Sequence, residues 1–140
     1  MIVEEPYLQL LGKSFSPALA ERQTGLSFTE RNEVGELGTR GKYEGIPLPF
    51  GSATLQAPPE VDPSERLDWI LDSVLPHAEA LRNLGGMEGW LHSTFYFDAQ
   101  CNLAYPPGQL QKLSQLGIPY TVSCIQAPER FGGAEPVRAA

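Results

Sequence analysis

The stretch 62–84 constrains the fold of this chain more than any other. It opens with a helix start signal: Asp62 can cap the first turn, Pro63 suits the first helical position, and Glu65 stands three residues after the cap. Glycines at 85–86 end it. Apolar residues recur at spacings of three and four, which predicts one buried stripe. The stripe comprises Leu67, Ile70, Leu71, Val74, Leu75, Ala78, Leu81 and Leu84.

Pro76 interrupts this pattern, because a proline cannot donate the backbone hydrogen bond to the carbonyl of Asp72. The apolar stripe continues in phase beyond it, so we expect one kinked helix over 62–84. A second short helix that begins at Pro76 is the alternative.

Strand-like runs flank this helix and are its expected packing partner. The clearest is 88–97, where residues for the two faces of a strand alternate. The run at 7–12 is apolar on both faces, which predicts a central strand. Further strands are expected at 50–56 and 118–125, and short helices at 16–23 and 107–116.

Residues 26–49 show no helical period and carry charges of alternating sign. We interpret them as an extended, partly exposed ribbon, with a hairpin closed by Gly41 or Gly45. Together the elements predict an α+β two-layer sandwich, in which helices cover one face of a mostly antiparallel sheet. We expect a single domain over 1–126 and a loose tail over 127–140.

Charge and composition exclude several functions. A net charge of −7 over 140 residues argues against a nucleic-acid ligand, because phosphate contacts need clustered Lys and Arg. Cys101 and Cys124 have neither Cys-x-x-Cys spacing nor clustered His, so we expect no metal and no cofactor. We expect free thiols in a reducing, cytoplasmic setting, while a single disulfide stays open as an alternative. The sequence also predicts no membrane span and no signal peptide.

Six segments with turn, helix-start or strand-end residues follow one another along the chain. They are the first strand ending at Gly12, the helix start at 15–17, the stretch 24–26, the Gly-rich 41–45, the segment 75–81 of the long helix and the helix-to-strand passage 109–125. This order resembles the DUF4279 family, a bacterial domain of unknown function, over roughly residues 7–125.

The resemblance implies a compact ferredoxin-like domain, and some members of that family are proposed as immunity proteins in bacterial toxin systems. Two positions depart from the family pattern. Lys13 and Ser14 stand where an acidic pair is common, and small residues at 51–53 replace a Trp.

An acidic surface at the start of the long helix carries our first functional hypothesis. Acids in a first helical turn complement the helix dipole, but Asp68 and Asp72 lie beyond that turn. We therefore predict a non-enzymatic protein-interaction domain, an immunity or regulatory factor, that binds a basic partner. Trp69 lies off the apolar stripe and would anchor the interface, or else cover the edge of the core. The predicted partner-binding residues are Asp62, Glu65, Asp68, Trp69 and Asp72.

A small-molecule-binding domain or minor enzyme is the alternative hypothesis. It would use the sheet face or the Gly-rich ribbon, with a pocket that gathers perturbed acid–base groups. The residues for such a site are Arg40, Tyr43, His92 and Tyr96. A third possibility is self-association through an exposed strand edge, so the chain is expected to be a monomer or a homodimer.

Overall fold

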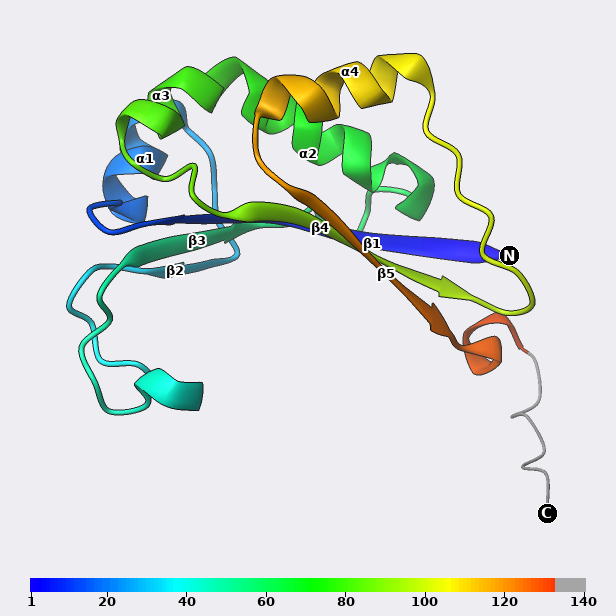
Figure 1. Cartoon of the computed structure of the whole chain (residues 1–140), viewed down its shortest axis with the longest axis horizontal. Coiled ribbons are helices and arrows are strands. Elements are labelled where there is room, and N and C mark those ends of the chain that lie inside the picture. The colour runs from blue at the N-terminus through cyan, green and yellow to red at the C-terminus, as the bar shows by residue number, and fades with distance from the viewer. Residues whose placement is uncertain (133–140) are drawn as a thin grey trace.

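The structure is a computed structural model that describes residues 1–132. Within these residues one sheet of five strands has the order β2-β3-β1-β4-β5, and helices cover one of its faces (Figure 1). The strands are β1 (Ile2–Gly12), β2 (Glu30–Asn32), β3 (Gly51–Leu55), β4 (Trp90–Phe97) and β5 (Tyr120–Gln126). The helices are α1 (Pro17–Thr24), α2 (Arg66–Val74), α3 (Ala78–Asn83) and α4 (Pro107–Leu116), with the 3₁₀ turns η1 (Gly41–Tyr43), η2 (Pro63–Glu65), η3 (Leu75–His77) and η4 (Pro128–Phe131).

The sheet confirms the expected α+β class. β1 lies in the middle, as its two apolar faces predict, and pairs antiparallel with β3 on one side and β4 on the other. β4 and β5 are parallel, because α4 crosses back over the sheet between them. The sheet is thus mostly antiparallel, whereas the ferredoxin-like arrangement is not confirmed.

The expected single helix over 62–84 is wrong in detail. The chain instead forms η2, α2, η3 and α3 in succession, and the break at Leu75–His77 falls where Pro76 cannot continue the backbone ladder. α3 begins at Ala78, so the alternative of a second short helix is nearer to the structure. Gly85, at φ 79°, ends this series, as expected from the sequence.

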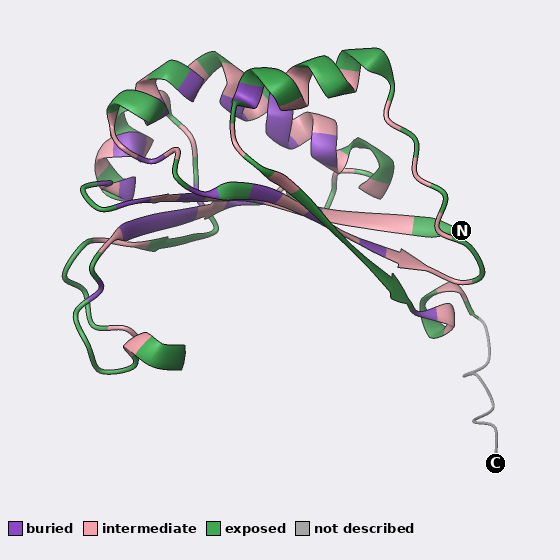
Figure 2. Ribbon diagram, in the orientation of Figure 1, coloured by how far each residue is buried: buried purple, intermediate pink, exposed green. Residues whose placement is uncertain are grey.

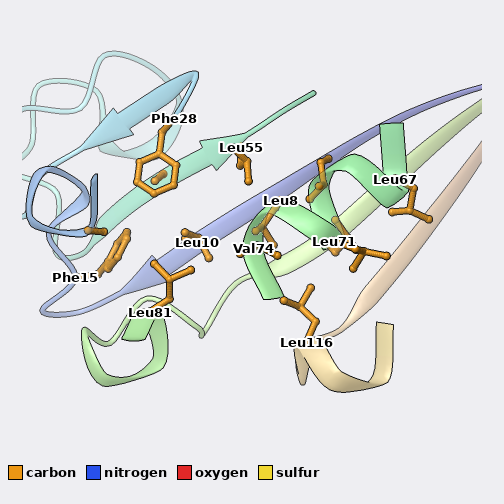
Figure 3. Packing of buried hydrophobic residues seen from close by; sticks show 14 residues of the cluster. Leu8, Leu10, Phe15, Phe28, Leu55, Leu67, Leu71, Val74, Leu81 and Leu116 are labelled. Atoms are coloured by element: carbon orange, nitrogen blue, oxygen red, sulfur yellow. The ribbon is translucent and has the colours of Figure 1, made fainter. Parts of the chain in front are cut away.

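The core lies between this helical series and the sheet. The predicted stripe faces inward, with Leu67, Leu71, Val74 and Leu81 almost fully buried. These side chains meet those of β1 and β3 in Figure 3, and Figure 2 shows the buried residues gathered in the layer between helices and strands. Full burial of one such leucine contributes about 2 kcal/mol, so this stripe is the main attachment of the helices to the sheet.

Residues 33–50 connect β2 to β3 as a long loop that extends below the sheet in Figure 1. Backbone hydrogen bonds tie its two arms together, from the amide of Gly35 to Leu48 and from that of Gly38 to Ile46. Gly41 and Gly45 both have positive φ at the tip. A ribbon closed at these glycines agrees with the prediction.

Residues 127–132, at the start of the segment expected to be a loose tail, contact the sheet. Ala127 is buried, η4 follows, and the guanidinium of Arg130 lies 3.0 Å from the carboxylate of Glu5 on β1. This contact joins the start of the segment to the sheet, and the expectation of a loose tail over 127–140 stays a prediction. The remainder of the segment, 133–140, lies outside the described residues. Among residues 1–132 no helix is both long enough and apolar enough to span a membrane.

Candidate functional site

Asp62 acts as the cap that its sequence context predicts. Its carboxylate accepts hydrogen bonds from the backbone amide of Ser64 at 2.9 Å and from the Ser64 hydroxyl at 2.6 Å. Both bonds hold the pKa of Asp62 below its ordinary value, and the bond from the Ser64 hydroxyl has the larger effect. Glu65 follows at the N-cap of α2 and is exposed. Both acids therefore lie at the surface, and Asp62 is already engaged in its own turn.

Asp68 and Asp72 face α4 and share one cation. The ammonium of Lys112 lies 2.8 Å from the carboxylate of Asp72 and 3.7 Å from that of Asp68. The amide of Gln109 donates to Asp68 at 3.3 Å. α4 thus offsets part of the charge that the predicted acidic surface would present to a partner, although all these groups stay solvent-accessible.

Trp69 does not share a surface with Asp68 and Asp72. It packs against the apolar core and lines a separate cavity of about 690 Å³ together with Arg66 and Ser73. Asp68 and Asp72 instead contact α4, so the predicted anchor and this acidic pair point away from each other. The structure therefore favours the reading in which Trp69 covers the edge of the core.

The four residues of the alternative site lie on separate parts of the fold. His92 and Tyr96 share the helix-free face of β4, where Nδ1 of His92 is 2.6 Å from the hydroxyl of Thr121. Arg40 and Tyr43 belong to the loop 33–50 that connects β2 to β3. Arg40 pairs there with Glu30 at 3.5 Å, and the Tyr43 ring stacks edge-on against Phe50. None of the three cavities described for residues 1–132 is lined by more than one of these four residues.

A polar cluster on the helix-covered face of the sheet is absent from the sequence predictions. The carboxylate of Glu4 on β1 accepts hydrogen bonds from the hydroxyl of Ser93 at 2.5 Å and from that of Tyr120 at 3.4 Å. Tyr120 also donates to Ser93 at 2.9 Å, and its oxygen lies 3.3 Å from the hydroxyl of Tyr105. β1, β4, β5 and the loop before α4 thus each supply one member.

Burial changes the acid–base properties of this cluster. Desolvation raises the pKa of Glu4 above its ordinary value, and the hydrogen bonds from Ser93 and Tyr120 offset only part of that rise. The negative charge of Asp68 raises it further. Burial likewise raises the pKa values of Tyr105 and Tyr120, so both phenols stay protonated as donors. Glu4 is the one group of the cluster that can carry charge.

Glu4 also lines a cavity of about 460 Å³, which we call the Glu4 pocket. Its walls come from the start of β1, from η2, from β4, from the loop 98–106 and from the first turn of α4. In Figure 1 the start of β1 and the loop 98–106 lie at the end of the sheet marked N. The lining residues used below are Glu4, Asp62, Phe95, Asn102, Tyr105 and Gln109.

The pocket combines acidic and aromatic groups. Glu4 and Asp62 bring two carboxylates, Tyr105 and Phe95 bring rings, and none of its described lining residues is Lys or Arg. A carboxylate beside aromatic rings is the usual environment for an ammonium or guanidinium group. No group of three or more His, Cys, Asp or Glu side chains within 1–132 could hold a metal ion.

One signal in the sequence could have revealed Glu4. Alternate residues of a strand share a face, so Glu4 has the same parity as the buried Leu8 and Leu10. An acid at a core-facing position implies hydrogen-bond partners and a perturbed pKa. The strand expected from the sequence begins at Tyr7, and Glu4 therefore lies outside it, whereas β1 begins at Ile2.

Comparisons with protein-family models, with curated proteins and with solved structures found no match to this chain.

Proposed function

We propose that this chain is a non-enzymatic binding domain that takes a basic side chain of a partner protein into the Glu4 pocket. The observation that carries the proposal is the partly buried Glu4 carboxylate, beside aromatic rings, in a cavity whose other charged lining residue is also an acid. A lysine or arginine side chain would supply the missing positive charge.

The raised pKa of Glu4 supports a basic ligand in a second way. Burial disfavours the ionised form of the Glu4 carboxyl, and a bound cation would favour it. Binding would then release a proton wherever Glu4 is protonated in the free protein. Affinity should consequently rise with pH until the free protein is itself ionised.

The surface predicted from the sequence contributes the rim of this site. Asp62 lines the pocket, and Gln109 connects the pocket to Asp68. A basic segment that inserts one side chain could lay its next charges near Asp68 and Asp72. Trp69 has no part in this proposal, because it lines the other cavity.

The resemblance to the DUF4279 family, with its ferredoxin-like expectation, supplies the biological setting that we propose. In that setting the chain is a bacterial cytoplasmic immunity or regulatory factor, and its partner is a basic protein. The charge of the pocket, and not the resemblance, supports the basic character of that partner.

A fluorescein-labelled hexalysine peptide tests the proposal by fluorescence anisotropy. Glu4→Gln should weaken binding about tenfold, because it removes the charge and keeps the side-chain shape. Glu5→Gln is the matched control: it removes the same charge from the neighbouring residue, which pairs with Arg130 on the other face of β1. We expect its effect to stay within about twofold. Equal losses in both variants would mean that net charge alone attracts the peptide, and would overturn the proposal.

A free small amine is the second candidate ligand, because the cavity volume falls within the range of roughly 300–1,000 Å³ typical of small-molecule sites. Titration with n-butylamine distinguishes the two. If n-butylamine competes fully and hexalysine binds no more tightly than it does, the pocket serves a small molecule. If hexalysine binds far more tightly, contacts outside the pocket contribute, as a protein partner requires.

A further inference from the structure

The two cysteines of the chain lie side by side, although 23 positions separate them. Cys101 is in the loop 98–106 between β4 and α4, and Cys124 is on β5. Their sulfur atoms are 3.3 Å apart, with both residues present as free thiols. Cys124 is exposed and Cys101 is half-buried, so a small oxidant can reach the pair.

We propose that Cys101 and Cys124 form a modification site, at which oxidation creates a disulfide that fixes one wall of the Glu4 pocket. The sulfurs need to approach by only roughly 1.2 Å to reach the bond length of about 2.05 Å. Such an approach requires local adjustment of a loop and not a rearrangement of the sheet. The second part of this proposal, the effect on the pocket, rests on the proposed function.

Hydrogen peroxide is the oxidant that the chemistry needs. The thiolate of Cys124, the more exposed residue, attacks one peroxide oxygen, the O–O bond breaks, and water leaves after protonation. The resulting sulfenic acid is then attacked by the sulfur of Cys101, which displaces hydroxide as a second water. Two thiols are oxidised to one disulfide and one peroxide is reduced to two waters, so atoms and electrons balance.

The order of attack follows from the surroundings of the two thiols. Burial raises the pKa of the Cys101 thiol, and the neighbouring Cys124 sulfur adds to that rise. Cys101 is therefore the poorer first nucleophile near neutral pH, but it is in place to resolve a sulfenic acid on Cys124. Because both steps need a thiolate, the reaction should accelerate with rising pH.

The disulfide would act on the pocket through the chain that follows Cys101. The next four residues, 102–105, all line the Glu4 pocket. Phe95, the strand partner of Cys124 in β4, lines it as well. The sulfurs already lie together while the cavity is present, so the bond would hold the wall in its present position. A wall ordered before binding lowers the entropic cost of binding.

Peroxide titration of the full chain tests the modification itself. After oxidation, a peptide map should contain one linked pair with Cys101 and Cys124, iodoacetamide should label neither thiol, and a reductant should restore both. Cys101→Ser and Cys124→Ser should each abolish the linked peptide. Separate conversion of the two cysteines to sulfinic acids, or links only between different chains, would overturn the proposal.

Binding of labelled hexalysine to the reduced and oxidised forms tests the consequence. We expect the oxidised form to bind at least threefold more tightly, and the double variant Cys101→Ser, Cys124→Ser to respond to peroxide not at all. If the disulfide forms and both forms bind equally, the link to the pocket is overturned. If the disulfide forms and neither form binds, the proposed function fails while the modification site stands.

Discussion

The hydroxyl of Ser93 donates a hydrogen bond of 2.5 Å to the carboxylate of Glu4 across the β1–β4 ladder. Both side chains lie on the face of the sheet that the helices cover, where Ser93 is fully buried. A carboxylate held in this position is satisfied by hydrogen bonds but has no basic partner there among residues 1–132. Burial of the ionised Glu4 carboxylate lowers the stability of the folded protein. A destabilising charge of this kind is typical of binding and catalytic sites.

The first prediction follows from the raised pKa of Glu4. A carboxyl whose pKa is higher in the folded than in the unfolded state makes the folded state bind more protons, so stability falls as pH rises through that interval. Glu4→Gln should therefore raise the Tm by a few degrees at pH 7.5, and this gain should disappear near pH 4. Thermal unfolding at both pH values measures it.

Glu5→Gln serves again as the control, because this residue is half-exposed and paired with Arg130. Glu5→Gln removes this ion pair and should leave the Tm at pH 7.5 unchanged or slightly lower. A Glu4→Gln variant that is less stable at both pH values would show that the carboxylate is stabilising, contrary to the burial argument.

The second prediction concerns Lys112, whose ammonium lies between Asp68 and Asp72. Lys112→Gln frees both carboxylates, so labelled hexalysine should bind about threefold more tightly and with a steeper dependence on salt. Stability should change little, because the ion pairs are solvent-accessible. Lys13→Gln makes the same change in net charge at the opposite end of β1 from Glu4 and should leave affinity nearly unchanged. Equal gains in both variants would remove Lys112 from the site.

Much of the fold could be predicted because its signals are local. The apolar stripe from Leu67 to Leu81 has a clear 3.6-residue period, and strand alternation in 90–97 is equally clear. The class follows from these two patterns and their order along the chain. The helix break was less predictable, since a proline after an in-phase stripe fits either a kink or two helices, and local packing decides between them.

β1 begins at Ile2, five residues before the start that the sequence predicts. Pro6 suggests a break, because it has no amide to donate to a neighbouring strand. In the described structure, however, β3 pairs with β1 only from Leu8 to Gly12. Pro6 therefore has β4 alone as a neighbour, and a proline is tolerated beside an unpaired edge. The strand could extend to Ile2, which brings Glu4 onto the core-facing side.

The candidate site could not be assembled from the sequence for a different reason. Its members stand at positions 4, 62, 93, 105 and 120, and their proximity depends on which strands are neighbours. Strand order follows from tertiary packing and has no local signal. The same holds for Asp68 and Trp69, which are adjacent in the chain but contact different neighbours.

The third prediction concerns Gly12, where two backbone segments approach closely. A Cβ atom at this residue would lie 1.7 Å from the carbonyl oxygen of Gly85. Gly12→Ala must therefore displace the end of β1 from the loop after α3, and we expect a loss of about 3 kcal/mol in the free energy of unfolding. Urea denaturation measures this quantity.

Gly108→Ala is the matched control. Gly108 lies in the first turn of α4, and an added Cβ would meet no atom within 4 Å. Alanine should be neutral or stabilise by about 0.5 kcal/mol, because it lowers the entropy of the unfolded chain. Equal destabilisation at both positions would contradict the close approach of Gly12 and Gly85.

The fourth prediction tests whether the Cys101–Cys124 disulfide fits the fold without strain. The bond would close a long loop that includes all of α4, and closure restricts the unfolded chain more than the folded one. We expect the oxidised chain to gain about 3 kcal/mol in the free energy of unfolding and roughly 10 °C in Tm over the reduced chain. The double variant Cys101→Ser, Cys124→Ser should unfold like the reduced chain with or without peroxide. An oxidised form with a verified disulfide but lower Tm would mean that the bond strains β5 or the loop, and that the two sulfurs do not lie together in the relaxed protein.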